Sequence, residues 1–116
     1  KKIKKYGKKP GVTLNPDTKI DKIIPYLRDL ELVMVMSVFP GFSGQKFMPE
    51  VLDKVQTLVK ARKIHRAKDM LIEIDGGINP KTAKKAIEAG VDLLASGSYI
   101  FKSKNRKKAI ERLRQV

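Results

Sequence analysis

Residues 70–90 read MLIEIDGGINPKTAKKAIEAG, and this stretch holds one complete strand, loop and helix. The apolar run 70–74 predicts a strand that ends at the turn Asp75-Gly76-Gly77. Asn79-Pro80 supplies a capping residue and a favoured first-turn residue, and Gly90 ends the helix. A strand, a glycine-rich loop and a helix in this order form the repeating unit of a parallel α/β sheet.

The same order recurs along the rest of the chain, so we expect four strand-and-helix units. The predicted strands are 11–14, 32–38, 70–74 and 91–96, and the predicted helices are about 19–30, 50–64, 80–89 and 105–115. Pro25 lacks an amide donor, so it should kink the first helix or delay its start. Four parallel β/α units are half of a (β/α)8 barrel. The predicted fold class is therefore α/β, with residues 1–116 as the C-terminal half of a TIM barrel and residues 1–9 as the end of a preceding helix.

Composition excludes some classes of site. The 116 residues include no cysteine and one histidine, His65, so disulfides, zinc fingers, cysteine nucleophiles and multi-histidine metal sites are excluded. No apolar run approaches the roughly 18 residues of a membrane-spanning helix, and no signal segment opens the sequence. We expect a cytoplasmic protein with no membrane partner.

A net charge of +14 raises the alternative of a basic, non-catalytic module that binds a polyanion. Most of the positive charge is lysine spread over expected helix surfaces, and aromatic residues make up only 6% of the chain. Nucleic-acid readers favour arginine forks and interleaved aromatic side chains. We therefore expect no nucleic-acid partner.

Glycines gather directly after three of the predicted strands. They are Gly41 and Gly44, Gly76 and Gly77, and Gly97. Without a Cβ, their backbone amides can approach a ligand closely, and converging amides form an anion site. A phosphate group is the expected ligand, and tight turns are the alternative explanation for each loop.

Asp75 is the strongest catalytic candidate. It follows an apolar strand at the position where a barrel carboxylate points into the mouth of the barrel. A carboxylate there can bind a hard cation or transfer a proton, whereas an ordinary turn-forming aspartate is the alternative. Strand alternation places Glu73 on the same face, as a supporting group or as a filler of the barrel interior.

Four stretches of the chain together resemble the ribulose-phosphate 3-epimerase family. They are GVTLNP at 11–16, LVMVMSVFPGFSGQKF at 32–47, IEIDGGIN at 72–79 and ASGSYIF at 95–101. They occur in the family's order and spacing and span nearly the whole chain. Phe39 stands where the family more often has a polar residue, so loop chemistry can differ there.

The resemblance implies interconversion of D-ribulose 5-phosphate and D-xylulose 5-phosphate, by metal-assisted proton transfer at C3 in the pentose phosphate pathway. It implies two acid/base aspartates that, with two histidines, hold a divalent metal ion such as zinc, iron, manganese or cobalt; Asp75 matches the later aspartate, as catalyst and metal ligand. It also implies a sugar-phosphate substrate. The residues that match the substrate-binding positions are Gly41, Phe42, Ser43 and Gly44 in a covering loop, and Gly76, Gly77, Gly97 and Ser98 at the phosphate.

The family's other aspartate and both metal histidines come from earlier strands that this sequence does not contain. We therefore expect the chain alone to have little or no epimerase activity. Four strands of a barrel also leave two unpaired edges. We expect a homo-oligomer or pairing with an N-terminal half, and another phosphate-binding TIM-barrel enzyme is the alternative within enzymes.

Overall fold

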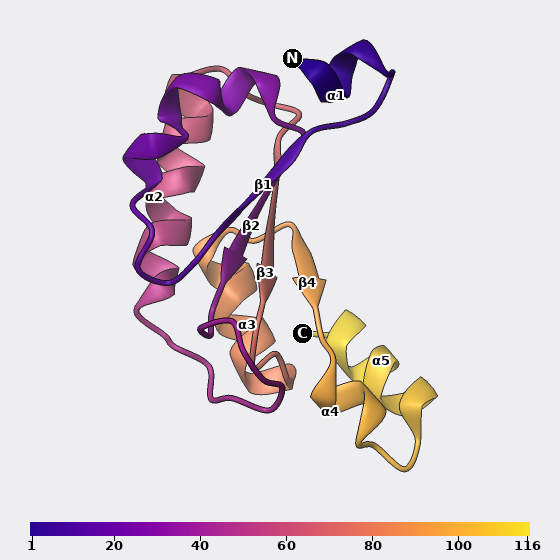
Figure 1. The fold of residues 1–116 in the computed structure, drawn as a ribbon. Coiled ribbons are helices and arrows are strands. Elements are labelled where there is room, and N and C mark those ends of the chain that lie inside the picture. The colour runs from indigo at the N-terminus through magenta and orange to yellow at the C-terminus, as the bar shows by residue number, and fades with distance from the viewer.

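The computed structural model describes all of residues 1–116 and shows one parallel sheet whose strand order, β1-β2-β3-β4, is the order along the chain (Figure 1). The strands are β1 (Gly11–Leu14), β2 (Leu32–Met36), β3 (Leu71–Asp75) and β4 (Leu93–Ala95). The helices are α1 (Lys2–Lys5), η1 (Ile20–Lys22), η2 (Ile24–Asp29), α2 (Val51–Ile64), α3 (Pro80–Ala89), α4 (Ser98–Phe101) and α5 (Arg106–Arg114). The predicted fold class, parallel β/α units with four strands, is confirmed.

The predicted α-helix at 19–30 is wrong. The segment forms two 3-10 helices, η1 and η2, that meet at Ile23, and Pro25 lies in the first turn of η2. Proline has no N–H and its ring crowds the preceding turn, so a continuous α-helix cannot run through this position. The apolar residues still reach the core, because Ile23 is 7% exposed and Leu27 is fully buried.

Helix α3 forms as predicted, with the same bounds. The Asn79 side chain accepts hydrogen bonds from the backbone N–H groups of Lys81 and Thr82, and the Thr82 hydroxyl accepts one from the Asn79 N–H. This reciprocal arrangement satisfies amides at the start of the helix that have no partner within it. Gly90 ends the helix in the left-handed conformation, with φ +106°.

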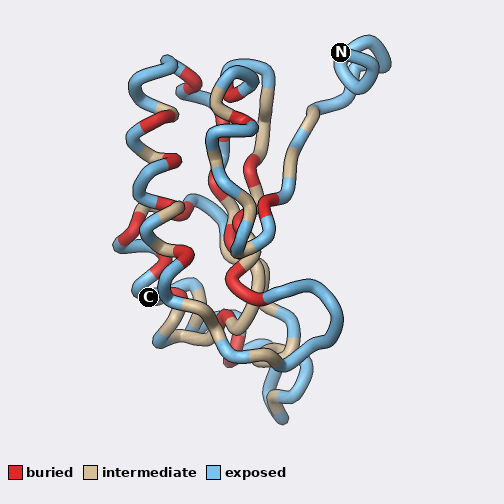
Figure 2. The backbone as a smooth tube through the Cα atoms, turned by 60° about the vertical axis from the view of Figure 1, so that its left-hand side comes forward, coloured by how far each residue is buried: buried red, intermediate tan, exposed pale blue.

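The core lies between the sheet and the helices on one of its faces. Val33 and Val35 of β2 and Ile72 and Ile74 of β3 are all fully buried. They alternate with more exposed neighbours along each strand, as side chains on opposite faces of a strand do. Buried residues, red in Figure 2, follow the strands and the helix surfaces turned toward them.

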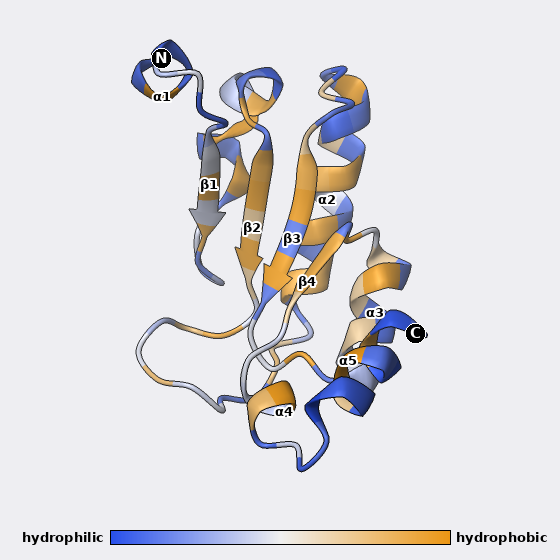
Figure 3. Ribbon diagram, turned by 90° about the vertical axis from the view of Figure 1, so that its right-hand side faces the viewer, coloured by the Kyte–Doolittle hydropathy of each residue, from blue (hydrophilic) through white to orange (hydrophobic).

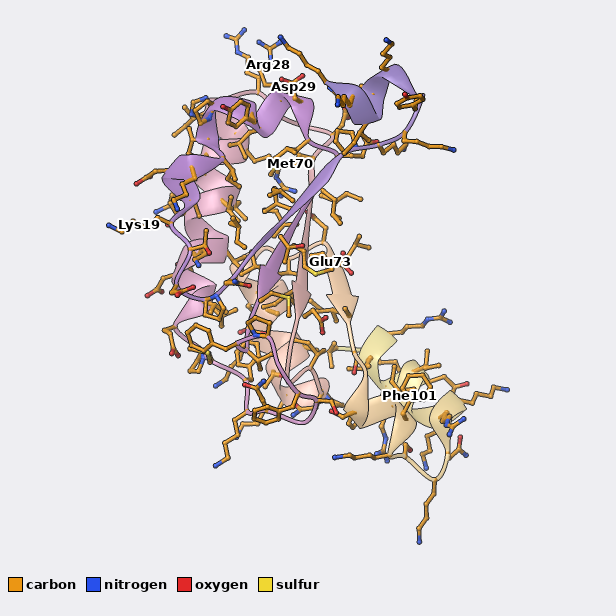
Figure 4. All side chains as sticks on the ribbon, viewed as in Figure 1. Lys19, Arg28, Asp29, Met70, Glu73 and Phe101 are labelled. Atoms are coloured by element: carbon orange, nitrogen blue, oxygen red, sulfur yellow. The ribbon has the colours of Figure 1, made fainter.

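The opposite face of the sheet has no helix on it, and Figure 3 views it from that side, with α2 behind β3. Parallel register aligns Met36 with Asp75, and Asp75 with Ala95, in one row across three strands. Glu73 and Asp75 share this face, as predicted, and Figure 4 shows Glu73 on the side of the sheet away from α2. The row that contains Asp75 lies at the carboxyl ends of the strands.

The helix α1 has no buried residue. Two ion pairs connect residues 1–9 to the segment that ends η2 and leads into β2. They join Lys4 Nζ to Asp29 Oδ1 at 3.0 Å and Lys9 Nζ to Glu31 Oε1 at 2.8 Å. The Lys4 ammonium lowers the pKa of the Asp29 carboxyl through a hydrogen bond and its charge. That residues 1–9 end a preceding helix stays a prediction. None of the helices combines the length and hydrophobicity needed to cross a membrane.

The strands' amino ends are held by a charged cluster centred on Asp92. Its Oδ2 lies 2.6 Å from Arg62 Nη1 and accepts a hydrogen bond of 2.8 Å from the Ile72 N–H. Arg62 also donates to the Met70 carbonyl oxygen at 3.0 Å. The two charged side chains are only 21% and 31% exposed, so this pair ties α2 to β3 and the start of β4.

Replacing Asp92 by alanine is expected to destabilise the fold by about 1–3 kcal/mol, because Arg62 and the Ile72 amide each lose a partner in a partly desolvated position. Urea unfolding followed by circular dichroism measures the change. The matched control is Asp21→Ala on the exposed η1, which should stay within about 0.5 kcal/mol of the parent chain. Equal midpoints for the two variants would contradict a structural role for the cluster.

Candidate active site

The carboxyl ends of β2, β3 and β4 surround one cavity of about 370 Å³. In parallel α/β folds, this edge is where ligands bind. Met36, Asp75 and Ala95 line the cavity at the strand ends, and the loop 38–45 lines another side. All nine residues predicted for the site line this single cavity: Gly41, Phe42, Ser43, Gly44, Asp75, Gly76, Gly77, Gly97 and Ser98.

Asp75 is anchored through its backbone. Its carbonyl oxygen accepts a hydrogen bond of 2.8 Å from the Ser37 N–H and one of 3.0 Å from the Ser37 hydroxyl. The Asp75 carboxylate itself takes part in no ion pair or hydrogen bond within the chain. A half-buried carboxylate on a fixed backbone is therefore available to a ligand in the cavity.

Gly76 and Gly77 follow Asp75 in conformations that other residues rarely adopt, with φ +123° and +64°. A Cβ on Gly76 would lie 2.7 Å from Val38 Cγ2, and one on Gly77 would lie 2.6 Å from the backbone nitrogen of Phe47. Backbone angle and space both require glycine at these positions. The loop therefore packs directly against the segment that follows β2.

Two serines that sequence reasoning left without a role hold these loops together. Ser37 is fully buried, and the one proton of its hydroxyl is shared between the carbonyl oxygens of Asp75 and Gly76. The Ser96 hydroxyl donates to the Ile78 carbonyl oxygen at 2.9 Å. Each serine directly follows an apolar strand and forms a hydrogen bond to the loop after β3. In the sequence, a single polar residue at the end of a buried strand is the pattern that could have indicated such a structural role.

The loop after β2 is braced by Gln45. Its side-chain amide donates to the carbonyl oxygens of Phe39 at 2.7 Å and Phe42 at 3.0 Å. Gly41 and Gly44 have positive φ, and Phe42 is 75% exposed at the tip. The loop thus forms a compact wall of the cavity and presents an aromatic side chain to solvent.

The residues of this chain do not make up a divalent metal site. No three side chains of the types His, Cys, Asp or Glu lie close enough to hold an ion. Asp75 is the only charged residue that lines the cavity. His65 follows the last residue of α2, near the amino ends of the strands, whereas Asp75 lies at the carboxyl end of β3. A lone carboxylate supplies one ligand where tight metal binding takes several.

Comparison with known proteins follows the same stretches of sequence. The model of the ribulose-phosphate 3 epimerase family matches residues 1–101. Ribulose-phosphate 3-epimerase from Bacillus subtilis is 46% identical over 97% of this chain and 52% of its own length. The Helicobacter pylori (strain 26695) protein of that name is 47% identical, over 98% of this chain and 52% of its own length. The cytoplasmic isoform of ribulose-phosphate 3-epimerase from rice (Oryza sativa) is 42% identical, over 97% of this chain and 49% of its own length.

Among solved structures, thiamine phosphate pyrophosphorylase from Pyrococcus furiosus aligns with a TM-score of 0.50 and 21% sequence identity. The alignment covers 90% of this chain and 57% of that one, and it supports the fold alone. The chain spans about half the length of the curated relatives it matches. The family match and the identities over nearly all of the chain are consistent with the motifs and the cavity, and the chain belongs to the ribulose-phosphate 3-epimerase family.

Proposed function

We propose that this chain supplies the phosphate-binding part and one acid/base residue of an enzyme that interconverts D-ribulose 5-phosphate and D-xylulose 5-phosphate. The observation that carries the proposal is the single cavity that Asp75 and three glycine-rich loops line together. Family membership provides the reaction, because the similar proteins are named for it. The plant relative named as a cytoplasmic isoform supports a cytoplasmic location.

The phosphate is assigned to the loops after β3 and β4. Gly76, Gly77 and Gly97 line the cavity, and their backbone N–H groups donate no hydrogen bond within the chain. Ser98 is the first residue of α4, so its N–H has no partner inside that helix. Such unpaired amides, held on a rigid scaffold, are suitable donors for phosphate oxygens.

In the proposed reaction, the Asp75 carboxylate removes the proton from C3 on one face of the substrate, or delivers it there in the reverse direction. Inversion needs a second acid/base group on the other face, since one carboxylate returns the proton to the side it came from. Residues outside this chain must supply that group. The same holds for a metal ion, for which Asp75 would be one ligand among several, and we assign no step to it. The loop 38–45 would exclude water from the cavity.

The uncovered sheet face supports a partner that completes the structure. Strands of parallel sheets are normally covered on both faces, and β1 and β4 each leave one edge unpaired. We infer that the chain pairs with the remaining half of a barrel, or with another copy of itself. Residues 1–116 would then act as one half-barrel unit.

Complementation tests the proposed function. The chain is expressed alone, and together with the part of the Bacillus subtilis relative that it does not cover. Formation of xylulose 5-phosphate is followed in a coupled assay with added divalent metal. We expect turnover only from the combined proteins, because each part lacks essential groups. Robust turnover by the chain alone, unchanged by Asp75→Asn, would contradict both the assigned residue and the need for a partner.

A phosphate titration tests the binding site without catalysis. In two-dimensional NMR spectra, the backbone amides of Gly76, Gly77, Gly97 and Ser98 should shift as inorganic phosphate is added. Affinity should be weak, about millimolar, because a small anion makes few contacts. The Asp69 amide, at the opposite end of β3, serves as an internal control. Glycine-loop amides that shift no more than Asp69 would remove the phosphate assignment.

A further inference from the structure

A second cavity, of about 570 Å³, adjoins the first. The two cavities share part of their lining, and the shared residues form what we call the glycine boundary: Gly44, Gln45, Gly77, Ile78 and Ser98. This boundary includes two of the four residues proposed to bind phosphate. A ligand seated there therefore contacts both cavities.

Charge is divided across the glycine boundary. The first cavity is lined by one charged residue, Asp75. The second is lined by three cationic residues, Lys46, Lys102 and Arg112, and by no acidic residue. None of these cations takes part in the chain's ion pairs, which involve Lys4, Lys9 and Arg62. The site is thus negative on one side of the boundary and positive on the other.

Lys102 is the cation placed against the boundary itself. Its Nζ lies 3.5 Å from the position that a Cβ on Gly44 would occupy. Its backbone N–H donates to the Ser98 carbonyl oxygen at 2.9 Å, so the two residues are one helical turn apart and share a side of α4. Figure 3 shows α4 beside the end of the loop that follows β2. Lys102 therefore reaches from the Ser98 side of the boundary to the Gly44 side.

A phosphate at this position needs positive charge as well as hydrogen bonds. Backbone amides donate but carry no net charge, and the nearby Asp75 carboxylate repels a dianion. Only the second cavity contains cationic groups that can offset the phosphate charge. The polarity of the site then also decides which end of the ligand faces Asp75.

We propose that Lys102 is a positioning residue that attracts the phosphate group of the ligand to the glycine boundary and so directs the reacting carbon toward Asp75. This inference rests on the proposed function, because it needs a phosphate ligand at those loops. It adds a selectivity: a phosphate monoester binds in this orientation, whereas a neutral sugar gains nothing from Lys102.

The test compares inorganic phosphate binding to the parent chain and to Lys102→Gln, by NMR titration of the Gly77 and Ser98 amides. A unit charge about 4 Å away in water contributes about fivefold in affinity, so the dissociation constant should rise about 3- to 10-fold in the variant. Raising KCl to 0.5 M should shrink this difference, because salt screens the charge. Lys102→Arg should bind within about twofold of the parent, since it keeps the charge.

Lys104→Gln is the matched control, because it removes the same charge from the same surface at an exposed residue outside both cavities. It should leave the dissociation constant within about twofold of the parent, since solvent and salt screen an exposed charge that lines neither cavity. If the parent amides shift but Lys102→Gln binds phosphate as Lys104→Gln does, the role of Lys102 is overturned and the phosphate assignment stands. If the parent amides do not shift at all, both are overturned.

Discussion

Exchange of Asp75 for asparagine is expected to lower the epimerase kcat of the complemented protein by about 10²- to 10⁴-fold, the usual contribution of a positioned acid/base group. Asparagine has nearly the same shape, and the Ser37 hydrogen bonds to this residue go to its backbone oxygen, so the loop should keep its structure. What is lost is the proton acceptor. Phosphate binding at the glycine loops should persist, because it does not use the carboxylate.

The matched control is Asp69→Asn, the same substitution at an exposed residue that precedes the other end of β3. It should leave kcat within about twofold of the parent, as surface changes away from a site usually do. Turnover is measured with saturating ribulose 5-phosphate, so that changes in KM do not enter. If Asp75→Asn and Asp69→Asn retain the same activity, Asp75 is not the acid/base group.

Replacing Gly77 by alanine is expected to destabilise the fold by about 2–5 kcal/mol, from the left-handed backbone conformation and an overpacked contact together. The added Cβ would lie 2.6 Å from the Phe47 nitrogen and 2.9 Å from its Cα. These are backbone atoms, so no side-chain rotation can relieve the contact. The loop after β2 and the loop after β3 would have to separate.

Gly97→Ala provides the comparison for this change. Gly97 has φ −103°, and a Cβ there would meet nothing within 4 Å. The free energy of unfolding of the Gly97→Ala variant should stay within about 1 kcal/mol of that of the parent chain. Urea unfolding measures both variants by circular dichroism. Equal loss of stability in the two would show that the close approach of Gly77 to Phe47 is not a determinant of the fold.

The sequence predicts the strands and α3 well because their signals are local. The strands β2 and β4 are uninterrupted apolar runs, and β1 and β3 are mostly apolar, with Thr13 in β1 and Glu73 and Asp75 in β3. Helix α3 begins at Asn79-Pro80 and ends before Gly90. The segment 19–30 also has apolar residues at helical spacing, but Pro25 excludes the continuous α-helix, and spacing alone does not distinguish two 3-10 turns from a kinked helix. The four-residue α4 is too short to produce a periodic pattern.

The sequence predicts which residues form the site only as well as it predicts the order of the strands. Once the strands are parallel and in chain order, their carboxyl ends meet, so Asp75 and the glycines must converge. The roles of Ser37 and Ser96 depend on hydrogen bonds between loops, which residue spacing does not specify. Lys102 lies in a lysine-rich segment, and the sequence alone does not distinguish it from lysines that only face solvent. Its place in the lining of the second cavity depends on the fold.

The order of the strands has a consequence for how the chain folds. The strands β2, β3 and β4 each pair with the strand that directly precedes them in the sequence, so no pairing waits for a distant segment. During synthesis from the amino end, each new unit can add to an edge that already exists, and loop closure involves only one intervening connection. Within residues 1–116, β4 is the strand that follows the others in the sequence, and it pairs with β3 only. Because β4 has three residues and one partner strand, its amides should exchange with solvent sooner than those of β2 and β3, which each lie between two strands.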